Sequence, residues 1–279
     1  MTEAQRLLAG AMHRLARSEW APLKNLLIRL LVHRYRIDMN EAVDPVATRY
    51  PSLNAFFTRA LKPEARPIAP AADALVSPVD GSVSQAGRIE RGRLLQAKGH
   101  DYGVEELLGG DRALAARFAD GAFATLYLAP RDYHRVHMPL DGRLARMDFV
   151  PGELFSVSDA TAQLVPQLFA RNERVVTLFE TAAGPLAMVL VGAIFVGSIE
   201  TVWAGEVREP RGAPVRWVYP PGEAPELAKG DEMGRFNMGS TVILLLPRDR
   251  VSWSPELRPG RRVRLGEPIG MLRLHRPSS

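Results

Sequence analysis

Apolar residues recur at helical spacing near the start of the chain, over residues 7–15 and again over 21–32. This spacing predicts two amphipathic helices. A third helix is expected to begin at Ser52, which is a favourable N-cap residue, to include Leu61, and to end at Lys62-Pro63. Trp20 and five leucines of the second helix are predicted to face one way: Leu23, Leu26, Leu27, Leu30 and Leu31.

Short strands separated by Gly and Asp turns are predicted from residue 74 onward. The clearest strands are 123–128, 175–179 and 242–246, and a pair of short helices is expected at 104–108 and 113–118. Residues 181–199 are uncharged, but Gly184-Pro185 and further glycines interrupt them. We therefore expect buried strands in this stretch instead of a membrane-spanning helix.

Two late segments, 227–234 and 263–270, resemble each other: each is a Gly-acid turn followed by a short apolar piece. Such an internal echo suits related corners in a sandwich of short strands. The predicted fold class is α+β, with N-terminal helices followed by a mainly antiparallel β sandwich or barrel-like core. The predicted division is a helical, membrane-associating segment over 1–62 and a β-rich catalytic domain over 63–279.

The composition fits one sizeable globular body, because 46% of the 279 residues are hydrophobic and 24% are charged. The chain has no cysteine, which excludes disulfides, thiolate nucleophiles and cysteine-ligated zinc. No secretory signal is recognisable at its start, so the protein is expected to stay in the cytoplasm.

The net charge of +5 comes from the first 36 residues, which hold seven Lys or Arg and two Glu. A cationic amphipathic helix can lie in a membrane interface, with its apolar face in the acyl boundary and its cations at anionic head groups. The other interpretation is an ordinary helix packed on its own domain. The sequence leaves both open.

The candidate catalytic residues lie mainly in two segments of the chain. Residues 130–139 hold His134 and His137 between two prolines, and Gly239-Ser240 immediately precedes the apolar run 242–246. A Gly-Ser peptide at the mouth of a buried strand can bring a hydroxyl close to the preceding carbonyl, although a simple tight turn would have the same sequence. Asp80, His137 and Ser240 could serve as orienter, base and nucleophile. No metal site is expected, because no further His or Cys lies near the histidine pair.

Several stretches together resemble the bacterial, pyruvoyl-dependent phosphatidylserine decarboxylase proenzymes, and they cover nearly the whole chain after the first helices. The matching stretches are Phe56-Phe57-Thr58-Arg59, Lys62-Pro63, Arg66-Pro67, residues 77–81, 96–100, 128–139, 151–157, 169–174 and 197–202, and Gly234-Arg235-Phe236 to Thr241. The one departure is Met238, where the family usually has Leu; the apolar volume is kept.

The resemblance implies that the chain makes its own cofactor. Ser240 would attack the Gly239 carbonyl with His137 as base and Asp80 as its orienter, giving an ester. Elimination then releases the Gly239 carboxylate, and hydrolysis leaves a pyruvoyl group and ammonia. A large chain ending at Gly239 and a small chain starting at position 240 would result.

The same resemblance implies the reaction and the partners. The pyruvoyl ketone would form a Schiff base with the phosphatidylserine amine and accept electrons as carbon dioxide leaves, giving phosphatidylethanolamine. His134 is the candidate for protonating the carbanion or handling the imine, and Phe155 and Ser156 for contacting the head group. A homodimer, peripheral on the cytoplasmic face of the cell (inner) membrane and without a nucleic-acid partner, is expected.

Two other functions stay open at this point. One is a pyruvoyl decarboxylase of a soluble amino acid, which the cationic amphipathic start argues against. The other is an uncleaved hydrolase that uses Asp80, His137 and Ser240 with the chain whole.

Overall fold

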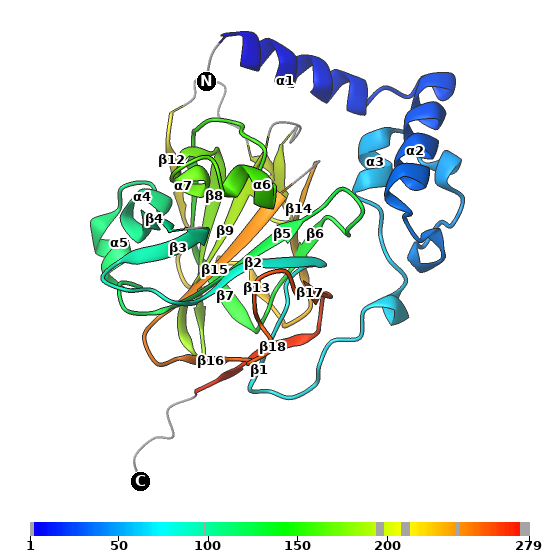
Figure 1. Ribbon diagram of the computed structural model, residues 1–279. Coiled ribbons are helices and arrows are strands. Elements are labelled where there is room, and N and C mark those ends of the chain that lie inside the picture. Colours follow the sequence, from blue (N-terminus) through cyan, green and yellow to red (C-terminus); the bar gives the residue numbers. More distant parts are fainter. Residues whose placement is uncertain (1–2, 98, 194–197, 208–212, 238–239, 274–279) are drawn as a thin grey trace.

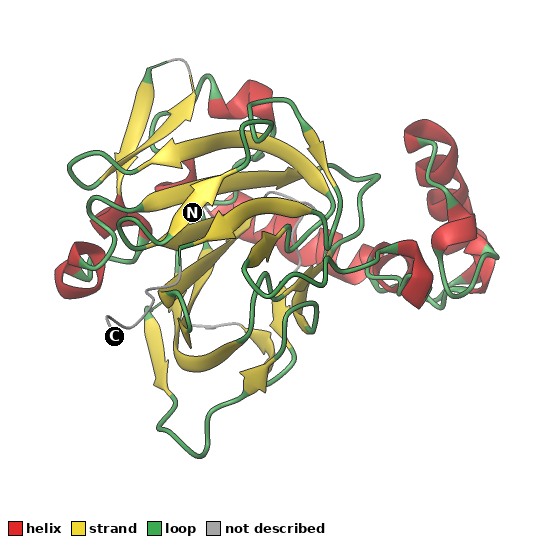
Figure 2. Cartoon of the chain, turned by 90° about the horizontal axis from the view of Figure 1, so that it is seen from below, coloured by secondary structure: helices red, strands yellow, loops and turns green. Residues whose placement is uncertain are grey.

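The computed structural model describes residues 3–97, 99–193, 198–207, 213–237 and 240–273 (Figure 1). Helices α1 (Glu3–Ala16), α2 (Ala21–Tyr35) and α3 (Leu53–Phe57), with their connecting turns, form an N-terminal appendage beside a β-rich core. Figure 2 shows from below that α2 and α3 lie to one side of the strands, whereas α1 runs behind them. Short 3-10 turns follow α2 and α3: Met39–Glu41, Ala47–Arg49 and Pro63–Ala65.

The core is built on a nine-stranded antiparallel sheet. In spatial order its strands are β12 (Val215–Val218), β7 (Gly142–Val150), β8 (Arg174–Thr181), β9 (Gly184–Gly192), β15 (Ser240–Leu246), β5 (Ala122–Leu128), β2 (Gly81–Arg88) and β17 (Arg262–Val263), while β13 (Glu226–Leu227) also pairs with β7. Hydrogen bonding on both edges therefore places β15 in the interior of the sheet.

Smaller sheets and short helices complete the core. A four-stranded sheet has the order β11 (Gly205–Val207), β10 (Ile199–Thr201), β14 (Glu232–Phe236) and β6 (Arg135–His137). A three-stranded sheet has the order β1 (Ala74–Val76), β18 (Pro268–Leu272) and β16 (Val251–Trp253), and β3 (Arg93–Ala97) pairs with β4 (His100–Gly103). The helices of the core are α4 (Val104–Leu107), α5 (Arg112–Ala116), α6 (Asp159–Ala162) and α7 (Leu168–Arg171).

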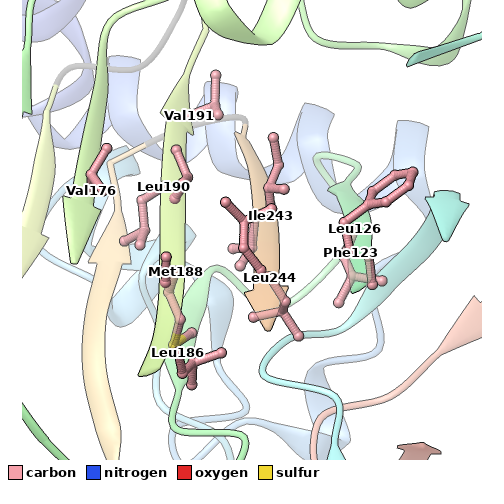
Figure 3. Close-up of a cluster of buried hydrophobic side chains, with 14 of the residues drawn as sticks. Phe123, Leu126, Val176, Leu186, Met188, Leu190, Val191, Ile243 and Leu244 are labelled. Carbon is pink, nitrogen blue, oxygen red and sulfur yellow. The ribbon is translucent and has the colours of Figure 1, made fainter. Parts of the chain in front are cut away.

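Apolar side chains of β15 and its neighbours form the centre of the core. All seven residues of β15 have 0% exposure. Figure 3 shows Ile243 and Leu244 of β15 between Leu190 of β9 and Leu126 of β5. A strand buried on both faces reads in sequence as a continuous apolar run, and this is how residues 242–246 read.

The predicted α+β class with a mainly antiparallel core is confirmed, although the sheets stay open and do not close into a barrel. The first two helices lie where predicted, and Ser52 caps α3 by accepting a hydrogen bond from the Ala55 amide. The prediction that α3 includes Leu61 was wrong. The helix ends at Phe57, and Leu61 instead bridges to Ala42 in extended conformation.

Residues 184–192 form strand β9, as the sequence predicted. Across the described residues, no helix combines the length and the apolar character that crossing a membrane requires.

The predicted single apolar face of α2 is divided between two environments. Leu27 and Leu31 pack on a small appendage core around Ile28. Leu26 and Leu30 are instead 64% and 61% exposed, as is Trp20 at 65%. Helix α2 therefore packs on the appendage core with one side and leaves large apolar side chains in solvent on the other.

The two echoing turns adopt the same conformation and meet the same side chain. Gly230 and Gly266 have φ values of +92° and +82°, in the left-handed region that favours glycine. A Cβ added to either would lie 2.8 Å from an Ile68 side-chain carbon. The sequence echo thus corresponds to two related corners that pack on Ile68.

We expect Gly266→Ala to destabilise the protein more than Gly260→Ala, which is its matched control. Both glycines have left-handed φ, a conformation that costs an alanine about 1–2 kcal/mol. At Gly266 the new Cβ would also lie 2.5 Å from the Pro67 carbonyl oxygen, whereas at Gly260 nothing lies within 4 Å. The overlap should add about 1–3 kcal/mol. Equal thermal unfolding midpoints for the two variants would contradict the crowding at Ile68 and Pro67.

Candidate active site

Ser240 begins strand β15 and is fully buried. Its strand partners are Leu128, the last residue of β5, and Gly192, the last residue of β9. The Ser240 hydroxyl has no hydrogen-bond partner among the described residues. A buried polar group left without a partner costs about 1–3 kcal/mol, so such groups in native proteins call for an explanation. Gly239, on the other side of the predicted cleavage bond, lies outside the described residues, as does Met238.

Asn237 anchors the segment that leads to Ser240. Its backbone N–H donates to the Ser198 carbonyl at 3.0 Å, and its side-chain Nδ2 donates to Ser198 Oγ at 2.6 Å. Its Oδ1 accepts a hydrogen bond of 3.0 Å from Asn54 Nδ2 on helix α3. The appendage is therefore hydrogen-bonded to the chain three residues before Ser240.

His134 lies fully buried in the loop between β5 and β6. Its ring stacks on Phe57 of α3, with centroids 3.9 Å apart. Nε2 donates to the Ala129 carbonyl at 3.1 Å, because that oxygen can only accept, and Nδ1 has no partner among the described residues. Burial, with a smaller contribution from the Arg59 cation, lowers the pKa of His134 to about 3. The ring is therefore neutral at pH 7 and keeps a free lone pair on Nδ1.

His137, on strand β6, has both ring nitrogens engaged. Nδ1 donates to the Gly230 carbonyl at 2.7 Å, and Nε2 lies 3.2 Å from the Tyr133 hydroxyl. Burial lowers the pKa of His137, and burial also raises the pKa of Tyr133 to about 12. The Tyr133 hydroxyl is thus a neutral donor to a neutral imidazole.

Asp80 is buried at the turn before β2, and its carboxylate forms an ion pair with Arg66. Arg66 Nε donates at 2.8 Å and 3.0 Å to the two carboxylate oxygens, and the Leu265 amide adds a bond of 2.9 Å. Arg66 Nη2 also donates to Glu41 at 2.7 Å. Although burial acts in the opposite direction, the bonds to Asp80 and Glu41 raise the pKa of Arg66. Such a buried pair holds the turn rigidly, since losing either partner would leave a buried charge.

The structure thus brings Ser240 and His134 to one end of the site. His134 follows the end of β5, where Leu128 pairs with Ser240, and its carbonyl accepts from the Phe236 amide at 3.0 Å. His137 pairs instead with Glu232, at the other end of β14. Glu232 lies four strand residues before Phe236, which is the residue bonded to His134, and four residues span roughly 13 Å along a strand.

Asp80 and His137 lie on adjacent segments, because the His137 amide donates to the Pro78 carbonyl at 2.9 Å. Within the described residues, however, no hydrogen bond joins Asp80 to His137 or His137 to Ser240. The three predicted roles are not assembled in this conformation, and their assignment stays a prediction.

The predicted head-group residues lie in a loop that is connected to the strand beside Ser240. The Phe155 amide and carbonyl both bond the side chain of Asn172, at 3.2 Å and 2.9 Å. Asn172 Nδ2 also donates to the carbonyl of Gly192, the strand partner of Ser240, at 2.8 Å. Phe155 is half-buried and Ser156 is exposed. The loop therefore borders the site, and Ser156 is accessible there.

Four residues that organise the site were given no role from the sequence: Asn54, Arg66, Tyr133 and Asn172. Arg66, Tyr133 and Asn172 stood inside stretches that carried the family resemblance. Their position inside those stretches was the signal in the sequence that could have pointed to a role for them. Their partners could not be deduced, since they come from distant parts of the chain.

Two family models match this chain. A family model described as phosphatidylserine decarboxylase matches residues 53–271, and a second, described as PSD, matches residues 5–36.

Relatives named phosphatidylserine decarboxylase proenzyme include one from Nitrosococcus oceani, 56% identical over 96% of this chain and 88% of its own length. Another, from Marinobacter nauticus, is 54% identical over 95% of this chain and 92% of its own. One from Acidovorax ebreus is 58% identical over 92% of this chain and 90% of its own. The chain therefore belongs to the phosphatidylserine decarboxylase family.

Proposed function

We propose that this protein is a self-processing phosphatidylserine decarboxylase that cleaves its own chain before Ser240. The observation that carries the proposal is the fully buried Ser240 hydroxyl, which has no hydrogen-bond partner among the described residues and lies at the start of the central strand. A hydroxyl in this position is available to attack the carbonyl that precedes it. Strand pairing on both sides holds its backbone while the segment before it is anchored through Asn237.

Cleavage requires Ser240 Oγ to add to the Gly239 carbonyl carbon while the peptide nitrogen leaves with a proton. We assign His137 as the base and Asp80 as its orienter. Because Arg66 holds Asp80, and Gly230 and Tyr133 hold His137, both side chains must exchange partners to act in this way. Loss of the Ser240 α-proton then releases the Gly239 carboxylate.

The residue at position 240 is suited to become a pyruvoyl group, because its hydroxyl is buried and no described residue competes for it. When present, that group supplies an electrophilic ketone and an electron sink for decarboxylation. His134 is assigned to protonating the carbanion or handling the imine. Its Nδ1 has no hydrogen-bond partner among the described residues, and Phe57 restricts its ring orientation. The Phe155 loop, with exposed Ser156, is assigned to the head group.

The lipid substrate is reached, in this proposal, from a peripheral position on the cytoplasmic face of the cell membrane. Exposed Trp20, Leu26 and Leu30 would enter the acyl boundary while neighbouring cations meet anionic head groups. Arg29 and Arg34, both exposed on α2, can supply those cations, whereas Lys24 is bonded to the Thr48 and Tyr50 carbonyls. On family resemblance the enzyme acts as a homodimer.

We expect Ser240→Ala to leave the chain whole. Denaturing mass analysis should show the intact 30.8 kDa species for the variant and two chains, 1–239 and 240–279, for the wild-type protein. Thr125→Val, which also removes a buried hydroxyl, should be cut normally. A wild-type protein that stays intact would exclude the self-processing proposal and favour an uncleaved hydrolase.

Substituting the two histidines should separate cleavage from turnover. We expect His134→Ala to be cut but to lose roughly 10²–10⁴-fold of its phosphatidylserine decarboxylation rate, because its proton-transfer group is gone. His137→Ala should remain largely uncut. Both are measured by mass analysis together with release of carbon dioxide from phosphatidylserine. Normal turnover by His134→Ala would remove that residue from the reaction, and an uncut His134→Ala with a cut His137→Ala would exchange the two roles.

Replacing both Leu26 and Leu30 by serine should weaken binding to anionic vesicles by roughly 10²–10⁴-fold, since each fully buried leucine contributes about 1.5–3 kcal/mol and every 1.4 kcal/mol is about a factor of ten. Both side chains are exposed, so folding and self-cleavage should be unaffected. Val218→Ser removes a 69% exposed side chain from β12 of the core and serves as the control in the same vesicle sedimentation assay. Unchanged binding by the double variant would refute the proposed membrane face.

A further inference from the structure

A pocket of about 480 Å³ lies where the appendage meets the β core. The appendage contributes Arg36, Glu41 and Arg59 to its wall, and the core contributes Asp80, Tyr133 and Arg262 among others. Six arginines and five carboxylates line it in all. Whether the pocket suits an anion or a cation therefore depends on which of these charges are already neutralised.

Each carboxylate of the wall is already engaged. Asp80 and Glu41 bind Arg66, and Asp132 binds Arg262. Glu267 pairs with Arg261, and Asp38 accepts from the Asn40 amide at 2.9 Å. The acidic groups of the pocket are thus paired or capped within the protein.

Arg59 is the exception among the buried charges. Its residue is only 4% exposed, and its Nε and Nη1 atoms have no hydrogen-bond partner among the described residues. The guanidinium lies 5.3 Å from the centre of the Phe56 ring. A cation–π contact uses the face of the guanidinium and leaves the N–H groups at its edge unsatisfied. A guanidinium stays charged when buried, so these donors require an acceptor from outside the described chain.

We propose that this pocket binds the phosphodiester group of a phospholipid head group, with Arg59 as the main donor and exposed Arg36 at the rim. A planar guanidinium can donate two parallel hydrogen bonds to phosphate oxygens, and one unpaired buried cation balances one phosphodiester charge. Arg36 directly follows α2, whose exposed Leu26 and Leu30 form the proposed bilayer face. The assignment of the anion to a lipid rests on that proposed membrane contact. The assignment of an anion site to this pocket does not depend on it.

The test is calorimetric titration of the purified, full-length protein with dihexanoyl phosphatidylglycerol below its micelle concentration, and separately with inorganic phosphate. Phosphatidylglycerol has no serine carboxylate, so binding is measured without turnover. We expect saturable binding of the lipid by the wild-type protein and roughly tenfold or greater weakening in Arg59→Gln, because a buried charge pair is lost. Arg112→Gln, an exposed arginine of α5 in the core, makes the same charge change and should bind as the wild type does.

Two further variants keep the test decisive if Arg59→Gln does not fold. Arg59→Lys retains the charge but not the paired donors, and Arg36→Gln changes only an exposed side chain. Each should bind the lipid several-fold more weakly than the wild type. Wild-type affinity in both variants, or no saturable lipid binding at all, would overturn the proposal. Binding of inorganic phosphate without binding of the lipid would overturn the assignment to a head group.

Turnover of phosphatidylserine by the wild-type protein separates this proposal from the proposed function. A protein that decarboxylates phosphatidylserine but does not bind phosphatidylglycerol contradicts only the pocket assignment. A protein that binds phosphatidylglycerol through Arg59 but leaves phosphatidylserine intact contradicts only the proposed reaction.

Discussion

The burial of Ser240 at the start of a strand paired on both edges is the constraint on which the rest of the site depends. Pairing with β5 and β9 fixes its backbone, and the apolar residues of β15 hold the strand in the interior. A hydroxyl carried into that interior without a partner is destabilising by itself. The large hydrophobic core offsets this cost, and so a reactive group can be kept in place without a hydrogen bond that would restrain it.

Several contacts connect the appendage to this strand, and breaking any one of them would be energetically costly. Phe57 covers His134, Asn54 bonds Asn237, and Arg66 joins Glu41 of the appendage to Asp80 of the core. Each of these contacts involves buried polar or aromatic groups, whose exposure or loss of a partner is costly. The position of the helices is therefore coupled to the geometry around Ser240. In the proposed function, the same helices contact the membrane, and this coupling would hold the reacting groups at a defined place relative to the bilayer surface.

Local patterns predicted much of the fold. Helices α1 and α2, the cap at Ser52, and strands β5, β8, β9 and β15 all follow from apolar periodicity and turn residues. The residue at which α3 ends could not be predicted from local patterns, because it depends on the β-bridge between Leu61 and Ala42 within the appendage. The apolar stripe of α2 was likewise visible in the sequence, but which leucines would pack on Ile28 and which would stay exposed depended on where α3 docks.

The sequence by itself determined the family, the serine at the head of an apolar strand and the pair of histidines in one loop, because these are properties of residue type and spacing along the chain. Only the tertiary structure decided what each polar group meets. Asp80 bonds Arg66 and the amide of Leu265, 185 residues away, and Asn54 bonds Asn237, 183 residues away. It also decided that His134 is buried against Phe57 and that Arg59 is buried with two nitrogens that no described residue bonds. Burial and hydrogen-bond partners arise when distant segments pack together, and no local pattern specifies them.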